Sequence, residues 1–309
     1  MITTVTLNVA VDKLYLVDNL NFGDVNRVKE CNTTAGGKGL NVSRVASILG
    51  EKVLATGFVG GHSGKYVEEL LNKDSIEHDF VHVDGESRTC INIIDKSGKS
   101  TELLEPGITV AQSDKNSFNT KFQNLIYDSD TVVLSGSVPL GCGSDYYPEL
   151  IKAAKEKGKK VILDTSGENL KQGIKAKPTM IKPNKSELES LLSVQIKTKE
   201  DIINAAKSIH EGGISYVVVS LGKDGAMVIC DEGIFEGTPP DVKVVNTVGC
   251  GDSMVAAFAV GFSRGYTAKD ALLYALAVSS ANAMCKQTGF LYPSQLNEII
   301  NKGKVTKLY

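Results

Sequence analysis

Two glycines and a carboxylate stand close together in Asn246-Thr247-Val248-Gly249-Cys250-Gly251-Asp252-Ser253. The stretch follows a valine-rich run over 242–245, which is typical of a strand, and precedes an apolar segment with the pattern of a buried helix. The turn is therefore predicted to lie at a helix N-terminus. There, unpaired backbone N–H groups and the helix dipole favour an anion such as phosphate, and glycine lets a ligand approach the backbone.

Asp252 stands at the edge of this predicted anion site, where its charge opposes that of a phosphate. The placement suits a general base that takes a proton from a substrate hydroxyl. The N–H groups of Gly249, Cys250 and Gly251 would then stabilise a phosphoryl group in transfer. An acidic residue in the first turn also stabilises a helix, so this motif alone leaves both interpretations open.

A second glycine cluster, Gly36-Gly37-Lys38-Gly39, precedes an amphipathic segment over 38–49 that is predicted to be helical. Its N–H groups and its lysine again suit an anionic or hydroxyl-rich ligand. The spacing excludes a Walker A loop, because Asn32 and Gly39 stand where that loop needs Gly and Ser or Thr. It also excludes a dinucleotide-binding fingerprint, whose third glycine would fall at Val42.

Composition narrows the function classes. The chain has 309 residues, and its 34 basic and 36 acidic residues give a net charge of −2 without a strongly basic block, so nucleic acid is not an expected partner. No stretch has the length needed to cross a membrane, and the first residues lack a signal-peptide pattern, so we expect a cytoplasmic protein. The six cysteines show neither disulfide nor zinc-site spacing.

Strand-like and helical patterns alternate along most of the chain, which predicts a parallel sheet with helices on both faces. The expected strands lie at 5–9, 53–58, 131–134, 161–163, 180–181 and 216–220. The expected helices lie at 38–49, 64–73, 145–157, 185–192 and 199–211. Two blocks with alternating polarity, 13–34 and 80–104, do not fit this core, and no linker divides the chain, so 1–309 is expected to form a single domain.

The two glycine motifs, in this order and about two hundred residues apart, resemble the signatures of the PfkB (ribokinase-like) family of carbohydrate kinases. Further segments are similar to the branch that contains 1-phosphofructokinases and tagatose-6-phosphate kinases. They are residues 6–12, 136–139, 164–168, 181–188 and 219–226. The chain departs from the pattern at Val9, Ile108, Asn246 and Cys250, none of which removes a proposed chemical group.

The resemblance implies an α/β fold, namely a ribokinase-like three-layer α/β/α sandwich with a mostly parallel central sheet. The blocks at 13–34 and 80–104 would form a small β-sheet lid over the substrate. In many members this lid also clasps a second subunit, so the resemblance implies a homodimer through the lid.

The resemblance also implies the site residues. The sugar phosphate would be bound by Asn8, Asp12, Gly36, Gly37, Lys38, Asn41, Arg88 and Arg27, with Asn8 and Asp12 at the carboxyl end of the first strand. ATP would be bound by Ser220, Gly222, Gly225, Asn282 and Asn184, and Glu187 would organise Mg²⁺ through water. Asn184 and Glu187 have the spacing of a helix capping box as well, and both roles are compatible. The family pattern leaves room for a monovalent cation.

The implied activity is ATP-dependent phosphorylation of a ketohexose monophosphate to the 1,6-bisphosphate. A ketohexofuranose carries hydroxymethyl groups at both ends, so one site could phosphorylate tagatose 6-phosphate at C1 or fructose 1-phosphate at C6. The motifs favour a tagatose-6-phosphate kinase, with 1-phosphofructokinase as the alternative. A regulator that binds a sugar phosphate without catalysis is the alternative of another class, because fold does not decide function.

Overall fold

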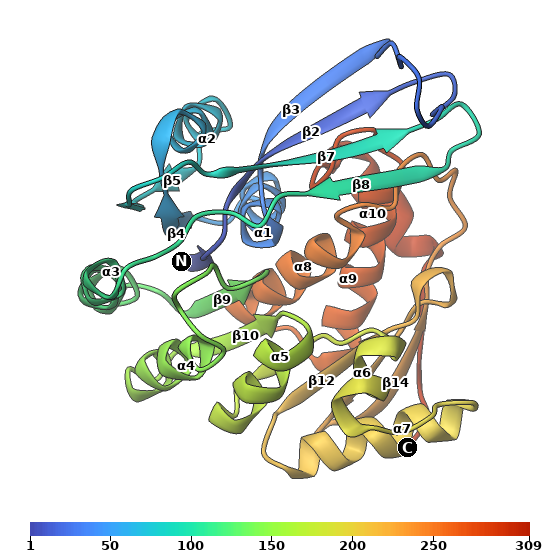
Figure 1. The fold of residues 1–309 in the computed structure, drawn as a ribbon. Helices are drawn as coiled ribbons and strands as arrows, with labels where there is room; N and C mark the ends of the chain where they lie inside the picture. The colour runs from blue at the N-terminus through green and yellow to red at the C-terminus, as the bar shows by residue number, and fades with distance from the viewer.

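The computed structural model describes all 309 residues, and its centre is an eleven-stranded sheet (Figure 1). Six neighbouring strands pair in parallel, which confirms the predicted mostly parallel core. They are β4 (Val53–Val59), β1 (Ile2–Thr6), β9 (Thr131–Ser135), β10 (Lys160–Asp164), β11 (Met180–Ile181) and β12 (Tyr216–Ser220). The antiparallel strands β13 (Ala226–Cys230), β14 (Gly233–Thr238) and β15 (Lys304–Lys307) extend one edge, and the short strands β5 (Glu77–His78) and β6 (Val81–His82) pair with β4 at the other.

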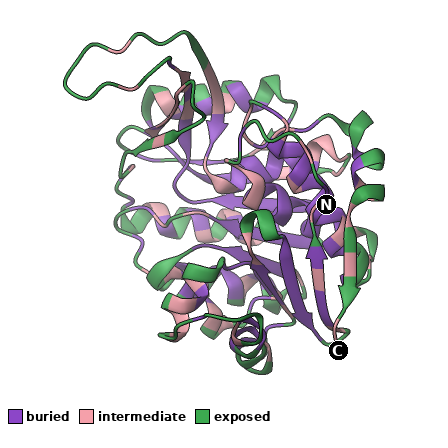
Figure 2. Cartoon of the chain, turned by 90° about the vertical axis from the view of Figure 1, so that its right-hand side faces the viewer, coloured by how far each residue is buried: buried purple, intermediate pink, exposed green.

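Helices cover both faces of this sheet, as the alternating patterns predict. One apolar cluster of 35 buried residues joins the sheet to α3 (Gln112–Leu125), α4 (Tyr146–Glu156), α5 (Gly167–Gly173), α6 (Lys185–Leu192) and α7 (Lys199–Glu211). A second cluster of 33 joins the other face to α1 (Lys38–Ile48), α8 (Cys250–Arg264), α9 (Ala268–Ala283) and α10 (Pro293–Lys302). The three-layer α/β/α sandwich is therefore confirmed, and its buried residues lie in the central strands and in the helices packed on them, α8 and α9 above all (Figure 2). None of the helices combines the length and the apolar character that crossing a membrane requires.

A separate four-stranded sheet forms the lid, at the top of Figure 1. Its strand order is β3 (Glu30–Gly36), β2 (Ala10–Leu16), β7 (Arg88–Ile94) and β8 (Ser100–Leu104). The helix α2 (Gly61–Lys73) packs against its base through a small cluster of buried apolar side chains that includes Val9, Val11 and Val67. This cluster fixes the inner ends of the lid strands to the core, whereas the connection between β2 and β3 is exposed.

Several predicted boundaries differ from the structure, and two of these differences bear on the site and the lid. The first core strand ends at Thr6, so Asn8 lies in the turn after it and Asp12 lies within the lid strand β2, not at the end of the core strand. Part of the block at 80–104 also lies outside the lid sheet, because Val81 and His82 pair with β4. Alternating polarity identifies a half-buried strand but does not say which of two sheets the strand joins.

The valine-rich run at 242–245 is not a strand, so the expectation of a strand directly before the second glycine motif was wrong. Pro239 and Pro240 precede the run, and proline cannot donate to a sheet ladder. The Val245 N–H donates to the carbonyl of Ala283 at the end of α9. The run is an irregular segment attached to α9, and Val244 is 58% exposed.

Candidate active site

Two cavities meet at the N-terminus of α8. The first, of about 580 Å³, lies under the lid, and Asp12, Lys38, Asn41, Arg88 and Asp252 are among its lining residues. The second, of about 610 Å³, is lined by residues of the 239–247 segment, of α9 and of the turn after β12. Gly251 lines both cavities. A group bound in one cavity therefore faces a group bound in the other across the α8 N-terminus.

The turn that opens α8 requires glycine at its first position. Gly249 has φ 81°, and a Cβ there would lie 2.7 Å from the Thr288 Cγ2 and 2.9 Å from the Gly289 N. The Cys250 N–H donates to the Thr247 carbonyl at 3.3 Å and the Ser253 N–H to the Gly249 carbonyl at 2.8 Å, which leaves the N–H groups of Gly249, Gly251 and Asp252 without an acceptor. Three free donors at a helix N-terminus match the anion site that the sequence predicts.

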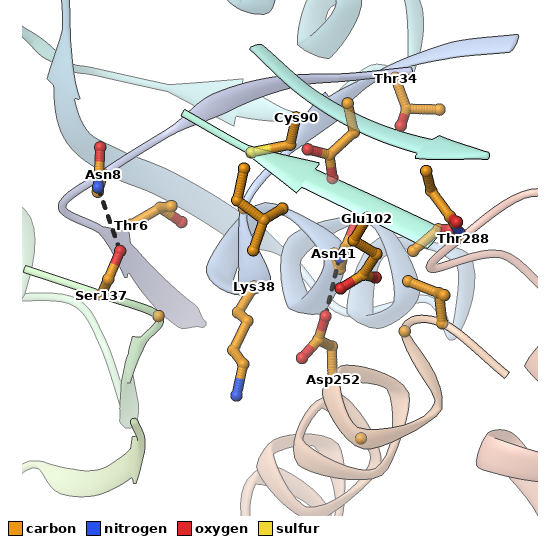
Figure 3. A pocket seen from close by; sticks show the side chains of 18 of the residues that line it. Thr6, Asn8, Thr34, Lys38, Asn41, Cys90, Glu102, Ser137, Asp252 and Thr288 are labelled. Carbon is orange, nitrogen blue, oxygen red and sulfur yellow. Dashed lines mark hydrogen bonds between the residues drawn. The ribbon is translucent and has the colours of Figure 1, made fainter. Parts of the chain in front are cut away.

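Asp252 lies one residue further along the helix and is buried, with 7% of its surface exposed. Its Oδ2 accepts a hydrogen bond of 2.8 Å from the Asn41 Nδ2, and the two side chains point toward each other in Figure 3. Burial raises the pKa of Asp252, while the charge of Lys38 and the hydrogen bond from Asn41 lower it in part. A carboxylate with a raised pKa and one oxygen free of protein donors has the properties of a general base.

A buried carboxylate holds two lysines beside this base. Asp164 ends β10, and its two oxygens lie 3.5 Å from the Lys38 Nζ and 3.4 Å from the Lys182 Nζ. Burial alone would raise the pKa of Asp164, but the two lysines outweigh burial and lower it. The charge of Asp164 in turn raises the pKa of Lys38. Asp164 therefore holds the Lys182 ammonium near Gly251, whose Cβ position would lie 3.3 Å from the Lys182 Nζ.

The lid side of the first cavity carries Asp12 and Arg88. Burial raises the pKa of Asp12 to about 6, although the N–H of Gly37 and the charges of Arg44 and Arg88 act to lower it. Gly36 is needed for this packing, because a Cβ there would lie 2.0 Å from the Asp12 Cγ.

Four polar atoms of residues that line the first cavity are buried without a hydrogen-bond partner: the Thr6 Oγ1, the Asn8 Oδ1, the Arg88 Nε and the Asn92 Nδ2. The Arg88 Nη2 donates to the Asn8 carbonyl at 3.1 Å, and the Asn8 Nδ2 donates to the Ser137 Oγ at 3.1 Å. Buried polar groups are normally paired, so unpaired ones in a cavity wall suit a hydroxyl-rich or anionic ligand.

The second cavity receives three of the predicted nucleotide residues, Ser220, Gly222 and Gly225, together with Asn184. Asn184 and Glu187 form a capping box at the start of α6, with hydrogen bonds of 2.8 and 2.9 Å. Asn282 is placed differently from the expectation. It is fully buried, lines neither cavity, and donates to the Val248 carbonyl at 3.1 Å, so it supports the glycine turn from behind.

Arg27 is not brought to the cavity. It is exposed in the connection between β2 and β3 and is absent from the walls of both cavities. Cys250 lines the second cavity, and burial raises the pKa of its thiol, so the helix N-terminus does not produce a reactive thiolate there.

The sequence reasoning missed several residues of the site. Lys182, Ser137 and Thr288 line the first cavity, and the 239–247 segment forms a wall of the second. Asp164 and Lys182 carried a usable signal, because each is a charged residue that ends or directly follows an apolar strand. Parallel strands bring their carboxyl ends to one edge of the sheet, where ligands bind.

Comparison with known proteins agrees with this geometry. The model of the pfkB family carbohydrate kinases matches residues 3–295. The chain belongs to this family. As a pfkB carbohydrate kinase it is a phosphotransferase with ATP as co-substrate, and the expected family membership is confirmed.

Relatives of this pfkB kinase include a tagatose-6-phosphate kinase of Staphylococcus epidermidis, 40% identical over 311 aligned positions that span 100% of both chains. Among solved structures, a Thermotoga maritima protein described as a possible 1-phosphofructokinase is 29% identical, with a TM-score of 0.92 and 100% of both chains covered. The phosphofructokinase-2 of Escherichia coli, solved with potassium, is 27% identical with a TM-score of 0.92, and 97% of this chain and 98% of that chain are covered.

Proposed function

We propose that this pfkB kinase transfers the γ-phosphoryl group of ATP to a ketohexose monophosphate and forms the 1,6-bisphosphate. One observation carries the proposal: the base-like Asp252 and the free N–H groups of Gly249 and Gly251 lie where the two cavities meet. A sugar in the first cavity and ATP in the second would face each other across that turn. We assign the sugar to Asn8, Asp12, Gly36, Gly37, Lys38, Asn41 and Arg88.

Tagatose 6-phosphate is the preferred candidate, because the relative with that name matches the whole chain at 40% identity. Fructose 1-phosphate is the second candidate, supported by the similarity to the Thermotoga maritima structure. The two acceptors differ in which end carries phosphate and in one hydroxyl direction at C4. A site that forms no hydrogen bond with that hydroxyl discriminates weakly, so some activity with both sugars is expected.

In the proposed reaction, a hydroxymethyl oxygen of the sugar loses its proton to Asp252 as the oxygen attacks the γ-phosphorus of ATP. A bond forms between that oxygen and phosphorus, and the bond to the ADP oxygen breaks. The N–H groups of Gly249 and Gly251 donate to the transferring oxygens, and Lys182 and Lys38 balance their charge. The Cys250 N–H, whose hydrogen bond to Thr247 is long, is available for the same contact after a small rotation.

Magnesium fits this site in the manner expected for a nucleotide-dependent kinase. The chain has no cluster of three or more His, Cys, Asp or Glu side chains that could form a metal cage. Mg²⁺ in kinases is held by one or two carboxylates, water and substrate phosphates, so a single Glu187 beside Asn184 is a sufficient protein contribution. When bound, the ion neutralises charge on the leaving diphosphate.

Replacing Glu187 with glutamine separates its two roles. Glutamine retains the capping box with Asn184, so the melting temperature is expected to stay within about 2 °C of the wild type. The loss of charge weakens attraction for the cation, so the Mg²⁺ concentration for half-maximal rate is expected to rise about tenfold. Titration of Mg²⁺ at fixed ATP measures this, and an unchanged requirement would remove Glu187 from the metal site. The matched control is Glu189→Gln on the same helix, because Glu189 accepts a hydrogen bond of 2.9 Å from the Ile196 N–H and has no contact with Asn184. Neither glutamate lines the walls of the two cavities, so Glu187 would reach the cation only through water and the nucleotide phosphates.

We also infer that the lid pairs two copies of the chain and that 1–309 is one domain with the lid inserted in it. Exposed apolar side chains cluster in lid segments, namely Phe22, Val25 and Val28 between β2 and β3, and Leu103 and Leu104 in β8. Burying them against a second copy would remove apolar surface from water. A monomer at micromolar concentration in analytical ultracentrifugation would refute the dimer.

A location in the cytoplasm, where ATP is abundant, is consistent with the six unpaired cysteines of this dimeric kinase.

The deciding experiment is Mg²⁺-dependent release of ADP with tagatose 6-phosphate, fructose 1-phosphate, fructose 6-phosphate and free fructose, each compared by kcat/KM. Preference for one phosphorylated ketohexose supports the proposal and names the acceptor. Saturable binding of a sugar phosphate without ADP release would instead support the non-catalytic regulator. The intact Asp252 and glycine turn argue against that alternative.

A further inference from the structure

Arg44 is a buried cation that the proposed reaction does not use. It lies on α1, one helical turn after Asn41, and only 3% of its surface is exposed. A guanidinium taken out of water is costly unless its donors are paired. The placement of this charge behind the sugar cavity therefore requires an explanation beyond packing.

The guanidinium connects several parts of the cavity wall. Its Nη2 donates to the Ala35 carbonyl at 2.6 Å, its Nε to the Asp74 Oδ2 at 2.9 Å, and its Nη1 to the Asn41 Oδ1 at 3.2 Å. A longer contact of 3.5 Å joins Nη1 to the Thr288 carbonyl. The end of the lid strand β3, the end of α2, the helix α1 and the loop after α9 thus meet at one side chain.

The contact with Asn41 has a consequence for Asp252. A carboxamide has one oxygen, which only accepts, and one NH₂ group, which only donates. Because Arg44 has only donors, it selects the Asn41 oxygen and leaves the NH₂ group facing the Asp252 Oδ2 at 2.8 Å. The flipped amide would set donor against donor at Arg44 and acceptor against acceptor at Asp252.

We propose that Arg44 is a positioning residue for the catalytic base, acting through Asn41 to hold the hydrogen bond that orients the Asp252 carboxylate. This inference rests on the proposed role of Asp252. With the Oδ2 occupied, the other carboxylate oxygen is presented to the substrate hydroxyl. Arg44 itself does not touch the substrate in this scheme.

The electrostatics of the site are consistent with this chain of contacts. The hydrogen bond from Asn41 lowers the pKa of Asp252, and the other charged groups that affect Asp252 are Lys38, Lys182 and Asp164. If Arg44 no longer fixes the amide, the pKa of Asp252 rises, and the acidic limb of the kcat profile moves to higher pH. Burial raises the pKa of Asp12, and the charge of Arg44 opposes this rise, so loss of Arg44 would raise the pKa of Asp12 further and would affect the KM of the sugar.

A double-mutant cycle between Arg44 and Asn41 tests the proposal. We expect Arg44→Met and Asn41→Ala each to lower kcat about tenfold and to move the acidic limb to higher pH. If Arg44 acts through Asn41, adding Arg44→Met to Asn41→Ala lowers kcat no further and leaves the acidic limb of the pH profile of kcat where Asn41→Ala placed it. Full additivity of the two effects on kcat would overturn the proposal.

Asp74→Asn is the matched control, because it removes the ion pair of Arg44 and leaves the contact with Asn41 in place. It is expected to lower the melting temperature slightly without changing kcat or the pH profile. If Asp74→Asn lowers kcat as Arg44→Met does, Arg44 only fastens α2 to α1 and the proposal fails.

Two further variants keep the test decisive if Arg44→Met does not fold. Arg44→Lys keeps the charge but loses the fork that reaches Asn41, so it should lower kcat while folding. Asn41→Leu keeps a similar side-chain volume and removes the donor to Asp252, so kcat should be reduced at least as far as in Asn41→Ala. Near-normal turnover of Asn41→Leu would overturn the proposal. Asp252→Asn distinguishes the failure of the positioning role of Arg44 from the failure of the proposed function. Normal turnover of Asp252→Asn would show that Asp252 is not the catalytic base at all.

Discussion

Asp252→Asn is expected to lower kcat by about two to four orders of magnitude while the fold is retained. The substitution keeps the size of the side chain and an oxygen that can accept the hydrogen bond of Asn41. It removes the only group at the α8 N-terminus that can take a proton from the acceptor hydroxyl. Binding of sugar and nucleotide should change little, because the cavity walls remain intact. Single-turnover and steady-state rates with the preferred sugar measure the loss.

The same variant should be at least as stable as the wild type at pH 8. Burial raises the pKa of Asp252 in the folded protein, so ionisation opposes folding as the pH rises through that pKa. Asparagine carries no charge and avoids this cost. The difference in stability between the variant and the wild type vanishes below the pKa that Asp252 has in the unfolded chain. Thermal unfolding at pH 8 and pH 3 checks the sign. Turnover within tenfold of the wild type in a folded Asp252→Asn protein would exclude the assigned base.

Asp164→Asn is expected to reduce the free energy of unfolding by about 3 kcal/mol, because it leaves a buried ammonium without its counter-ion. Lys182 is 7% exposed and bears most of this cost, whereas the side chain of Lys38 is 42% exposed and can turn to solvent. Lys182 would also lose its fixed position near Gly251, so kcat should fall as well. Denaturant unfolding and steady-state kinetics measure the two effects separately.

Two measurements test whether the unpaired Lys182 causes the loss of stability in Asp164→Asn: its dependence on pH, and the effect of a second substitution. The pKa of Asp164 is lowered in the folded state, so its contribution is present above the pKa of the unfolded chain and is lost as the pH falls through the folded value. The difference in the free energy of unfolding between Asp164→Asn and the wild type should therefore become smaller at acidic pH. Adding Lys182→Met should recover stability, since it removes the unpaired charge, but should not recover kcat. A double variant as unstable as the single one would contradict this explanation.

Local sequence was sufficient for the core. The helices at 185–192 and 199–211 match their predicted bounds because each begins with a side-chain cap, Asn184 or Thr198, and then shows a clear apolar period. The strands at 180–181 and 216–220 also match. The antiparallel strands β13 to β15 were not predicted, although the apolar run at 226–230 followed by Asp231, Glu232 and Gly233 is a local signal of a hairpin. That β15, from the end of the chain, pairs with β14 is a long-range contact that no local pattern indicates.

The sequence by itself determined the α/β class, the family and the two glycine turns, since glycine at a positive φ before a helix is a local requirement of the backbone. Only the tertiary structure decided which side chains meet there. The contact between Asn41 and Asp252 spans 211 residues, and that between Lys38 and Asp164 spans 126. Such contacts depend on strand order and on the packing of α1 against α8, which no local pattern encodes. The exposure of Arg27 and the burial of Asn282 could not be predicted for the same reason. A motif gives the position of a residue along the chain, but the packing of distant segments decides which atoms its side chain contacts.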